Sequence, residues 1–313
     1  MKNVRIEIRA VKIGGVLLAM LAVPVSIRAC ACGCEVFDVG TSSMFPNGPG
    51  GMAFVQYDFQ NQNRNWSGTS TARPENNDDK DIKTHFVTVG MQYMFSDKWG
   101  AQLEVPFDYR HFKGTDDDGK VATHDWSQLG DIRIEGIYTG FFEDMSAGVT
   151  FGLKLPTGSY TEDPHLVDRD TQLGTGSTDI LLGGFHRGNF ANSERWNWFA
   201  QLQADVPALT QAGYRPGVEL DTAAGIDYQM LSAGKARISP LAQVIFSQRW
   251  HDIGSNADPD NSGYQRILLS PGMELHIHPV QIYADAEFPV YQNFNGNQLA
   301  APVLFKVSVS WMF

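Results

Sequence analysis

The feature that most constrains the fold of this chain is an alternation of apolar and small polar residues that continues to the C-terminus. In the segment Val307-Ser308-Val309-Ser310-Trp311, every second side chain is apolar and the residues between them are serines. Successive side chains of a β-strand point to opposite faces. The segment is therefore a strand with one face in an apolar medium and the other in a polar one.

The chain then ends on an aromatic residue, Phe313. A final strand of this kind resembles the closing strand of a Gram-negative outer-membrane β-barrel, in which the terminal aromatic residue serves as the assembly signal. The resemblance implies that the barrel-assembly machinery is a partner and that outer-membrane lipid surrounds the protein.

Twelve segments alternate in the same manner, and turn residues bound each of them. We expect strands at roughly 51–63, 81–96, 99–113, 129–142, 145–157, 177–188, 196–207, 217–231, 236–249, 264–277, 280–292 and 300–313. Single-chain bacterial barrels have an even number of strands. The predicted fold is therefore all-β, a transmembrane antiparallel β-barrel of about 12 strands.

The predicted connections alternate between short and long. The long ones are expected at about 64–80, 114–128, 158–176, 208–216, 250–263 and 293–299. Outer-membrane barrels have short periplasmic turns and long external loops, so this parity places both termini on the periplasmic side. A soluble β-sandwich is the alternative, but it would not be expected to sort its loops by parity.

Charged residues belong on the lumen face of such a barrel, because a charge facing lipid near the midplane costs about 2–4 kcal/mol. The alternation predicts a lumen-facing set of Glu104, Asp108, Arg110, Asp131, Arg133, Glu135, Lys154, Asp285, Glu287 and Lys306. Two interpretations stay open. The charges form interior ion pairs that fix strand register, or they line a polar path for a solute.

The size of the barrel favours a narrow lumen. Eight strands leave an interior filled by side chains, whereas sixteen to eighteen leave an aqueous channel. Twelve strands lie between these cases, and we expect residues 32–50 to occlude part of the lumen.

The N-terminus has the pattern of a signal peptide over residues 1–31. A basic stretch precedes an apolar run from Ile13 to Val25, and Ala29-Cys30-Ala31 fits a small-residue cleavage site. A retained anchor is the alternative, although the run is shorter than the ~20 residues of a spanning helix. Removing five basic residues and one acidic residue with this segment takes the formal net charge from −11 to −15. A chain this acidic is not expected to bind nucleic acid.

All three cysteines lie together at the processing site, as Cys30, Cys32 and Cys34. Alternate positions of an extended segment point the same way, so the thiolates could hold a soft metal ion such as Cu(I) or Zn(II). Lipidation of Cys30, a disulfide in the oxidising periplasm, attachment of a periplasmic redox partner and no special role are the other interpretations. Arg28 is unsuited to a lipidation signal, and the spacing is shorter than that of most zinc sites.

The sequence gives little support to catalysis. It contains no HExxH, phosphate loop or Ser-His-Asp spacing. We therefore do not expect an enzyme.

Two short motifs resemble a known family. Gly152 to Gly158 reads G-L-K-L-P-T-G, and Leu173 to Asp179 reads L-G-T-G-S-T-D. A strand ending in K-x-P-T-G, a loop and a G-T-G-S-x-D segment resemble the outer-membrane proteins named for the meta-pathway of phenol degradation. The resemblance implies a barrel that admits small, often aromatic or hydrophobic compounds. The cysteine cluster is not part of that family pattern.

These observations predict a signal peptide at 1–31, a periplasmic segment at 32–50 and a barrel at 51–313. The expected function is an outer-membrane channel or transporter for small solutes. The alternative is a non-transport barrel that scaffolds a periplasmic metal or redox partner through the cysteine cluster.

Overall fold

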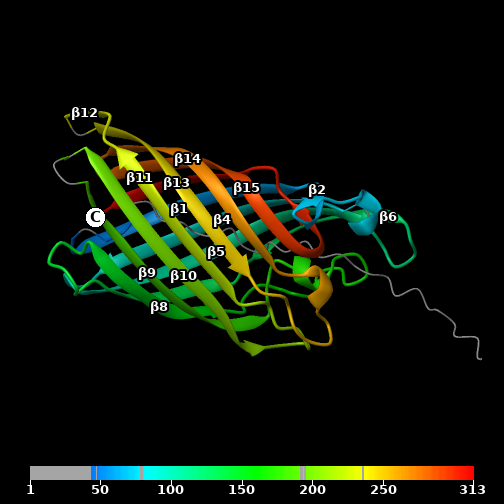
Figure 1. Ribbon diagram of the computed structural model, residues 1–313. Helices are drawn as coiled ribbons and strands as arrows, with labels where there is room; N and C mark the ends of the chain where they lie inside the picture. The colour runs from blue at the N-terminus through cyan, green and yellow to red at the C-terminus, as the bar shows by residue number, and fades with distance from the viewer. Residues whose placement is uncertain (1–43, 47, 78–79, 191–192, 194, 235) are drawn as a thin grey trace, which may run out of the picture.

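The computed structural model describes residues 44–46, 48–77, 80–190, 193, 195–234 and 236–313. In this part of the chain, twelve antiparallel strands close into a tilted barrel (Figure 1). The barrel strands are β1 (Gly50–Gln62), β4 (Asp81–Met94), β5 (Trp99–Thr115), β7 (Ile132–Tyr138), β8 (Ala147–Leu155), β9 (Ser177–Asn189), β10 (Trp196–Thr210), β11 (Glu219–Tyr228), β13 (Ala236–Arg249), β14 (Tyr264–Ile277), β15 (Val280–Ala300) and β16 (Leu304–Met312). The predicted twelve-stranded barrel is confirmed.

The first and last strands close the barrel. β1 pairs with β16 from Met52 opposite Met312 to Gln60 opposite Leu304. The terminal residue completes the seam, because the Phe313 backbone N–H donates to the Gly51 carbonyl at 2.8 Å and the Gly51 N–H donates to the Phe313 carbonyl at 2.7 Å. A closed ladder leaves no strand edge unpaired, as a spanning sheet requires in lipid.

Smaller elements lie at the two ends of the barrel. They are β2 (Arg64–Gly68), β3 (Ser70–Thr71), β6 (Val121–Leu129), β12 (Leu231–Ala233) and the short 3-10 helices η1 (Pro74–Asn77), η2 (Arg169–Thr171) and η3 (Pro259–Asn261). We call the end with connections such as 95–98 and 278–279 the turn end. The opposite end, where β2, β6 and residues 156–176 lie, is the loop end. The C-terminus lies at the turn end (Figure 1).

One predicted loop is wrong, and two others contain additional strands. Residues 293–299 are not a loop, because β15 continues to Ala300 and pairs there with β2. The physical reason is burial: Leu299 is fully buried and packs with apolar side chains of the loop end. Residues 64–80 contain β2 and β3, and residues 114–128 contain most of β6, which pairs with β5.

The outer face of the barrel is apolar, and aromatic rings circle its turn end. Along β16, Phe305, Val307, Val309 and Trp311 are exposed while the residues between them are buried. Rings in contact around the turn end are Tyr93–Phe95, Tyr93–Phe313, Trp99–Tyr138, Phe142–His186, His186–Trp198 and Trp196–Tyr228. Exposed apolar strands with a terminal aromatic belt are the surface of a barrel in lipid. Among the helices of the described residues, none is long and apolar enough to cross a membrane, a finding that does not bear on strands.

Candidate functional site

The ten predicted lumen charges all lie on the inward-facing side of the barrel wall or at its loop end. Nine are buried, and the Arg133 side chain is 16 % exposed. Strand register brings several of them side by side, since Glu104 of β5 lies opposite Arg133 of β7, and Arg133 lies opposite Lys154 of β8. Inward positions of antiparallel neighbours share one face, so Glu104 lies beside an opposite charge, whereas Arg133 and Lys154 are like charges that lie side by side.

Lys154 is the centre of one group of interior ion pairs. Its ammonium lies 2.7 Å from the Asp179 carboxylate on β9 and 2.9 Å from the Asp205 carboxylate on β10. Arg133 approaches the same Asp205 carboxylate at 3.9 Å. Two carboxylates and two cations at this spacing compensate one another in an environment where an unpaired charge would be costly.

A second polar group lies across the lumen, on β13 to β16 and β1. The Asp285 Oδ2 atom accepts hydrogen bonds from Ser270 and Tyr283, both at 2.6 Å, and from Gln243 at 3.0 Å. Lys306 lies opposite Asp285 in the register and 3.7 Å from the Asp58 carboxylate. These side chains make the inward face of β13 to β16 and β1 hydrophilic.

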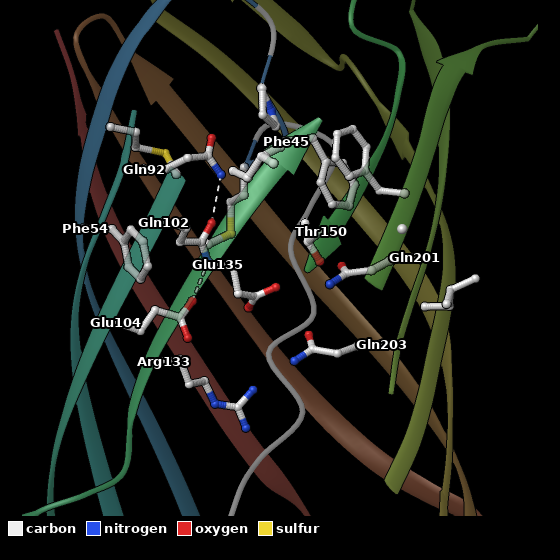
Figure 2. Close-up of a pocket in the computed structure, with 17 residues that line it drawn as sticks. Phe45, Phe54, Gln92, Gln102, Glu104, Arg133, Glu135, Thr150, Gln201 and Gln203 are labelled. Atoms are coloured by element: carbon white, nitrogen blue, oxygen red, sulfur yellow. Dashed lines mark hydrogen bonds between the residues drawn. The ribbon is translucent and has the colours of Figure 1, made fainter. Parts of the chain in front are cut away.

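Between these groups and the turn end lies an internal cavity of about 80 Å³ (Figure 2). Gln102 accepts a hydrogen bond from Gln92 at 3.0 Å and donates one to Glu104 at 2.5 Å. Figure 2 shows Glu104, Glu135 and Arg133 on one side and Gln201 and Gln203 facing them. A cavity of this size holds only a few water molecules.

An apolar layer closes the cavity on its turn-end side. The Phe45 ring stacks on Phe185 with centroids 4.5 Å apart and planes 2° apart. Met94, Ile137 and other apolar side chains pack around the pair. Pro46 is held by a hydrogen bond from the Arg187 guanidinium to its carbonyl at 3.2 Å. Residues 44–46 thus lie inside the barrel mouth, in line with the expected occlusion by residues 32–50, of which 32–43 and 47 are outside the described residues.

A second apolar layer closes the loop end. Leu166, Val167 and Leu173 of the 156–176 loop pack against Ile82, Phe112, Trp126 and Leu299. Lys80, which is 5 % exposed, forms an ion pair with Asp168 of the loop at 2.5 Å. Arg110 donates to the Thr171 carbonyl from inside the barrel. The loop is therefore folded over the lumen.

The two sequence motifs form the neck of this loop. Asp131 accepts hydrogen bonds from the Gly158 backbone N–H at 2.9 Å and the Thr175 backbone N–H at 2.8 Å, so it ties both ends together. A Cβ on Gly158 would lie 2.8 Å from the Gly174 Cα, which explains glycine there. Burial raises the pKa of the Asp131 carboxyl, and the Thr175 and Gly158 donors oppose that shift. We call Asp131, Gly158, Gly174 and Thr175 the loop clasp.

A second hollow shares part of its lining with the internal cavity. A hollow on the outer face of β9 to β13 is lined by small and apolar residues, among them Ala200, Ala224 and Val244. Four residues line both this outer hollow and the internal cavity: Gly184, Phe185, Gln201 and Leu202. Only the backbone and these side chains separate the lumen from the lipid-facing surface at this point.

Sequence reasoning missed Phe45 and the loop clasp. Phe45 lies in a glycine- and proline-containing stretch without periodicity, and its partner Phe185 is distant in sequence. The predicted cysteine site and signal peptide lie outside the described residues and stay predictions. Within the described part of the chain, three or more His, Cys, Asp or Glu residues nowhere gather as metal ligands.

No family model and no curated protein matches the chain. Solved structures do resemble it. An outer-membrane channel from Pseudomonas putida F1 superposes with a TM-score of 0.66 at 14 % identity, covering 89 % of this chain and 100 % of the channel. The β domain of the Bordetella autotransporter Brka gives 0.54 at 14 % identity, covering 85 % and 100 %. The fold is thus that of a bacterial outer-membrane β-barrel.

Proposed function

We propose that this protein is an outer-membrane channel for small solutes, with its loop end outside the cell and both termini in the periplasm. The observation that carries the proposal is the hydrophilic interior. A barrel that only had to be stable in lipid could fill its core with apolar side chains, because a buried ion pair is often no more stabilising than an apolar replacement. This barrel instead keeps amides, carboxylates and a cavity along its axis.

The two apolar layers act as gates in this proposal. Hydrophobic constrictions in a polar pore exclude water and so block flux until they open. The Phe45–Phe185 layer is the gate at the turn end, and the 156–176 loop is the gate at the loop end. Phe45 is held by stacking, by packing and by one hydrogen bond to its neighbour Pro46, so its displacement requires no strand to separate.

We extend the proposal to solutes with an aromatic or other apolar body. Two features support the extension: the phenylalanine rings that line the cavity, and the apolar outer hollow that shares Gly184 and Phe185 with the cavity lining. The resemblance of the K-L-P-T-G and G-T-G-S-T-D motifs to the meta-pathway family points to the same solute class.

Liposome swelling tests the channel. Liposomes containing the protein are diluted into an isotonic solution of a small neutral sugar, and the initial swelling rate is measured. Phe45→Ala should swell faster than the unchanged protein, because it removes half of the ring stack. Phe141→Ala, a matched change at an exposed ring of the same rim, should leave the rate unchanged. Swelling no faster than protein-free liposomes in all three proteins would contradict a channel.

A further inference from the structure

The interior of the barrel and of its loop end holds more acid than base. Among the described residues, thirteen acidic side chains are buried against six basic ones. Adding the partly buried Arg133, Arg187, Asp205 and Glu219 leaves the excess at seven. A pore whose walls carry one sign of charge concentrates ions of the other sign and repels those of its own.

Two of the buried cations are compensated by carboxylates at short range. Lys154 lies between Asp179 and Asp205, and Lys306 lies beside Asp58. The fields of these two cations therefore do not extend far along the lumen. A solute that enters the barrel meets more carboxylates than cations among the described residues, which favours a cation over an anion.

Several buried oxygens on β13 and β15 accept no hydrogen bond from the described residues. Three hydrogen bonds hold the Oδ2 atom of Asp285, and its Oδ1 atom accepts none from the described residues. Glu287 Oε1 and Gln243 Oε1 likewise accept no hydrogen bond from the described residues. The Asp285 and Glu287 side chains are 8 % and 2 % exposed. A fixed set of acceptors in a low-dielectric interior suits a ligand that brings N–H groups or a positive charge.

We infer, resting on the proposed channel function, that the solutes of this barrel are small organic cations with an apolar body, such as aryl- or alkylammonium ions. Asp285 is the specificity-determining residue of the lumen. Phe45, Phe54, Glu104 and Glu135 all line the internal cavity, so an ammonium group that passes this point meets both aromatic rings and carboxylates. Aromatic faces and carboxylates together recognise an ammonium group through cation–π and ionic contacts.

The test is the reversal potential in planar bilayers under a potassium chloride gradient, measured for the unchanged protein and for Phe45→Ala. We expect the sign of a cation-selective pore. Replacing Asp285 by Asn in the Phe45→Ala protein should lower the potassium-to-chloride permeability ratio by at least about twofold. The matched control Asp97→Asn, in the exposed 95–98 turn, should leave that ratio unchanged.

Two aromatic ions of opposite charge test the solute class. Phenyltrimethylammonium chloride should carry cation current, and potassium benzenesulfonate should carry little current from its anion. Equal permeation of the two aromatic ions, or a reversal potential at zero or of anion-selective sign, would overturn this inference while leaving a channel in place. Absence of current in both proteins would overturn the proposed function and this inference with it.

Discussion

Lys154 shows how single residues hold charge inside this barrel. Its ammonium is almost fully buried, and its two carboxylate partners come from different strands, so one side chain joins β8, β9 and β10. Removing the cation leaves Asp179 and Asp205 with one fewer positive neighbour in a site that water reaches poorly. Breaking a buried ion pair in this way typically costs more than the pair itself contributes.

We therefore predict that Lys154→Met lowers the free energy of unfolding by about 3–5 kcal/mol. Urea unfolding of the protein reconstituted in bilayers measures the change. Lys98→Met, at an exposed position of the 95–98 turn, should change stability by less than about 0.5 kcal/mol. Equal effects of the two substitutions would show that Lys154 is not an interior ion-pair residue.

The strands are the elements whose bounds the sequence predicted best. In lipid, the two faces of a strand differ strongly in polarity, so alternation marks the spanning part of a strand. The predicted strands at 236–249 and 264–277 have the bounds of β13 and β14, whereas β15 runs eight residues beyond its predicted end. β6 could not be predicted in this way. Much of it pairs with β5 beyond the barrel wall, where the two faces do not separate lipid from lumen.

The residues of the candidate site also divide into those whose placement the sequence predicts and those whose contacts it does not. The inward orientation of Glu104 or Lys306 follows from strand parity alone. The contact of Phe45 with Phe185 and that of Asp131 with Thr175 join segments far apart in sequence, and nothing local in either segment specifies its partner. The two family motifs can be recognised in the sequence, but their role at the neck of the 156–176 loop follows only from the structure.

The loop clasp makes a prediction at the scale of this element. In the structure, the two carboxylate oxygens of Asp131 each accept from one backbone N–H group, that of Gly158 or that of Thr175. Asp131→Asn replaces one of these oxygens by an amide nitrogen, which cannot accept a hydrogen bond, so one of the two N–H groups loses its acceptor. A buried donor left without an acceptor costs about 1–3 kcal/mol. Hydrogen exchange at these two backbone amides should therefore accelerate by about tenfold or more. The control Asp118→Asn, in the exposed tip of the β5–β6 hairpin, should leave both rates unchanged.

At the scale of the whole molecule, the barrel combines an apolar exterior, a charged interior and two apolar layers that close the interior at its ends. Each part follows from a different constraint. Lipid requires the exterior and the closed seam, and the proposed channel function accounts for the charged interior. The turn-end layer joins Phe45, which precedes the first strand, to side chains of the barrel strands, so one half of the ring stack is separate from the barrel wall.

Single-channel recording in planar bilayers is the direct test of a gated channel. We predict discrete conductance steps for the reconstituted protein that become larger or more frequent with Phe45→Ala and stay unchanged with Phe141→Ala. A folded, inserted barrel that shows no steps in any of the three proteins would contradict it.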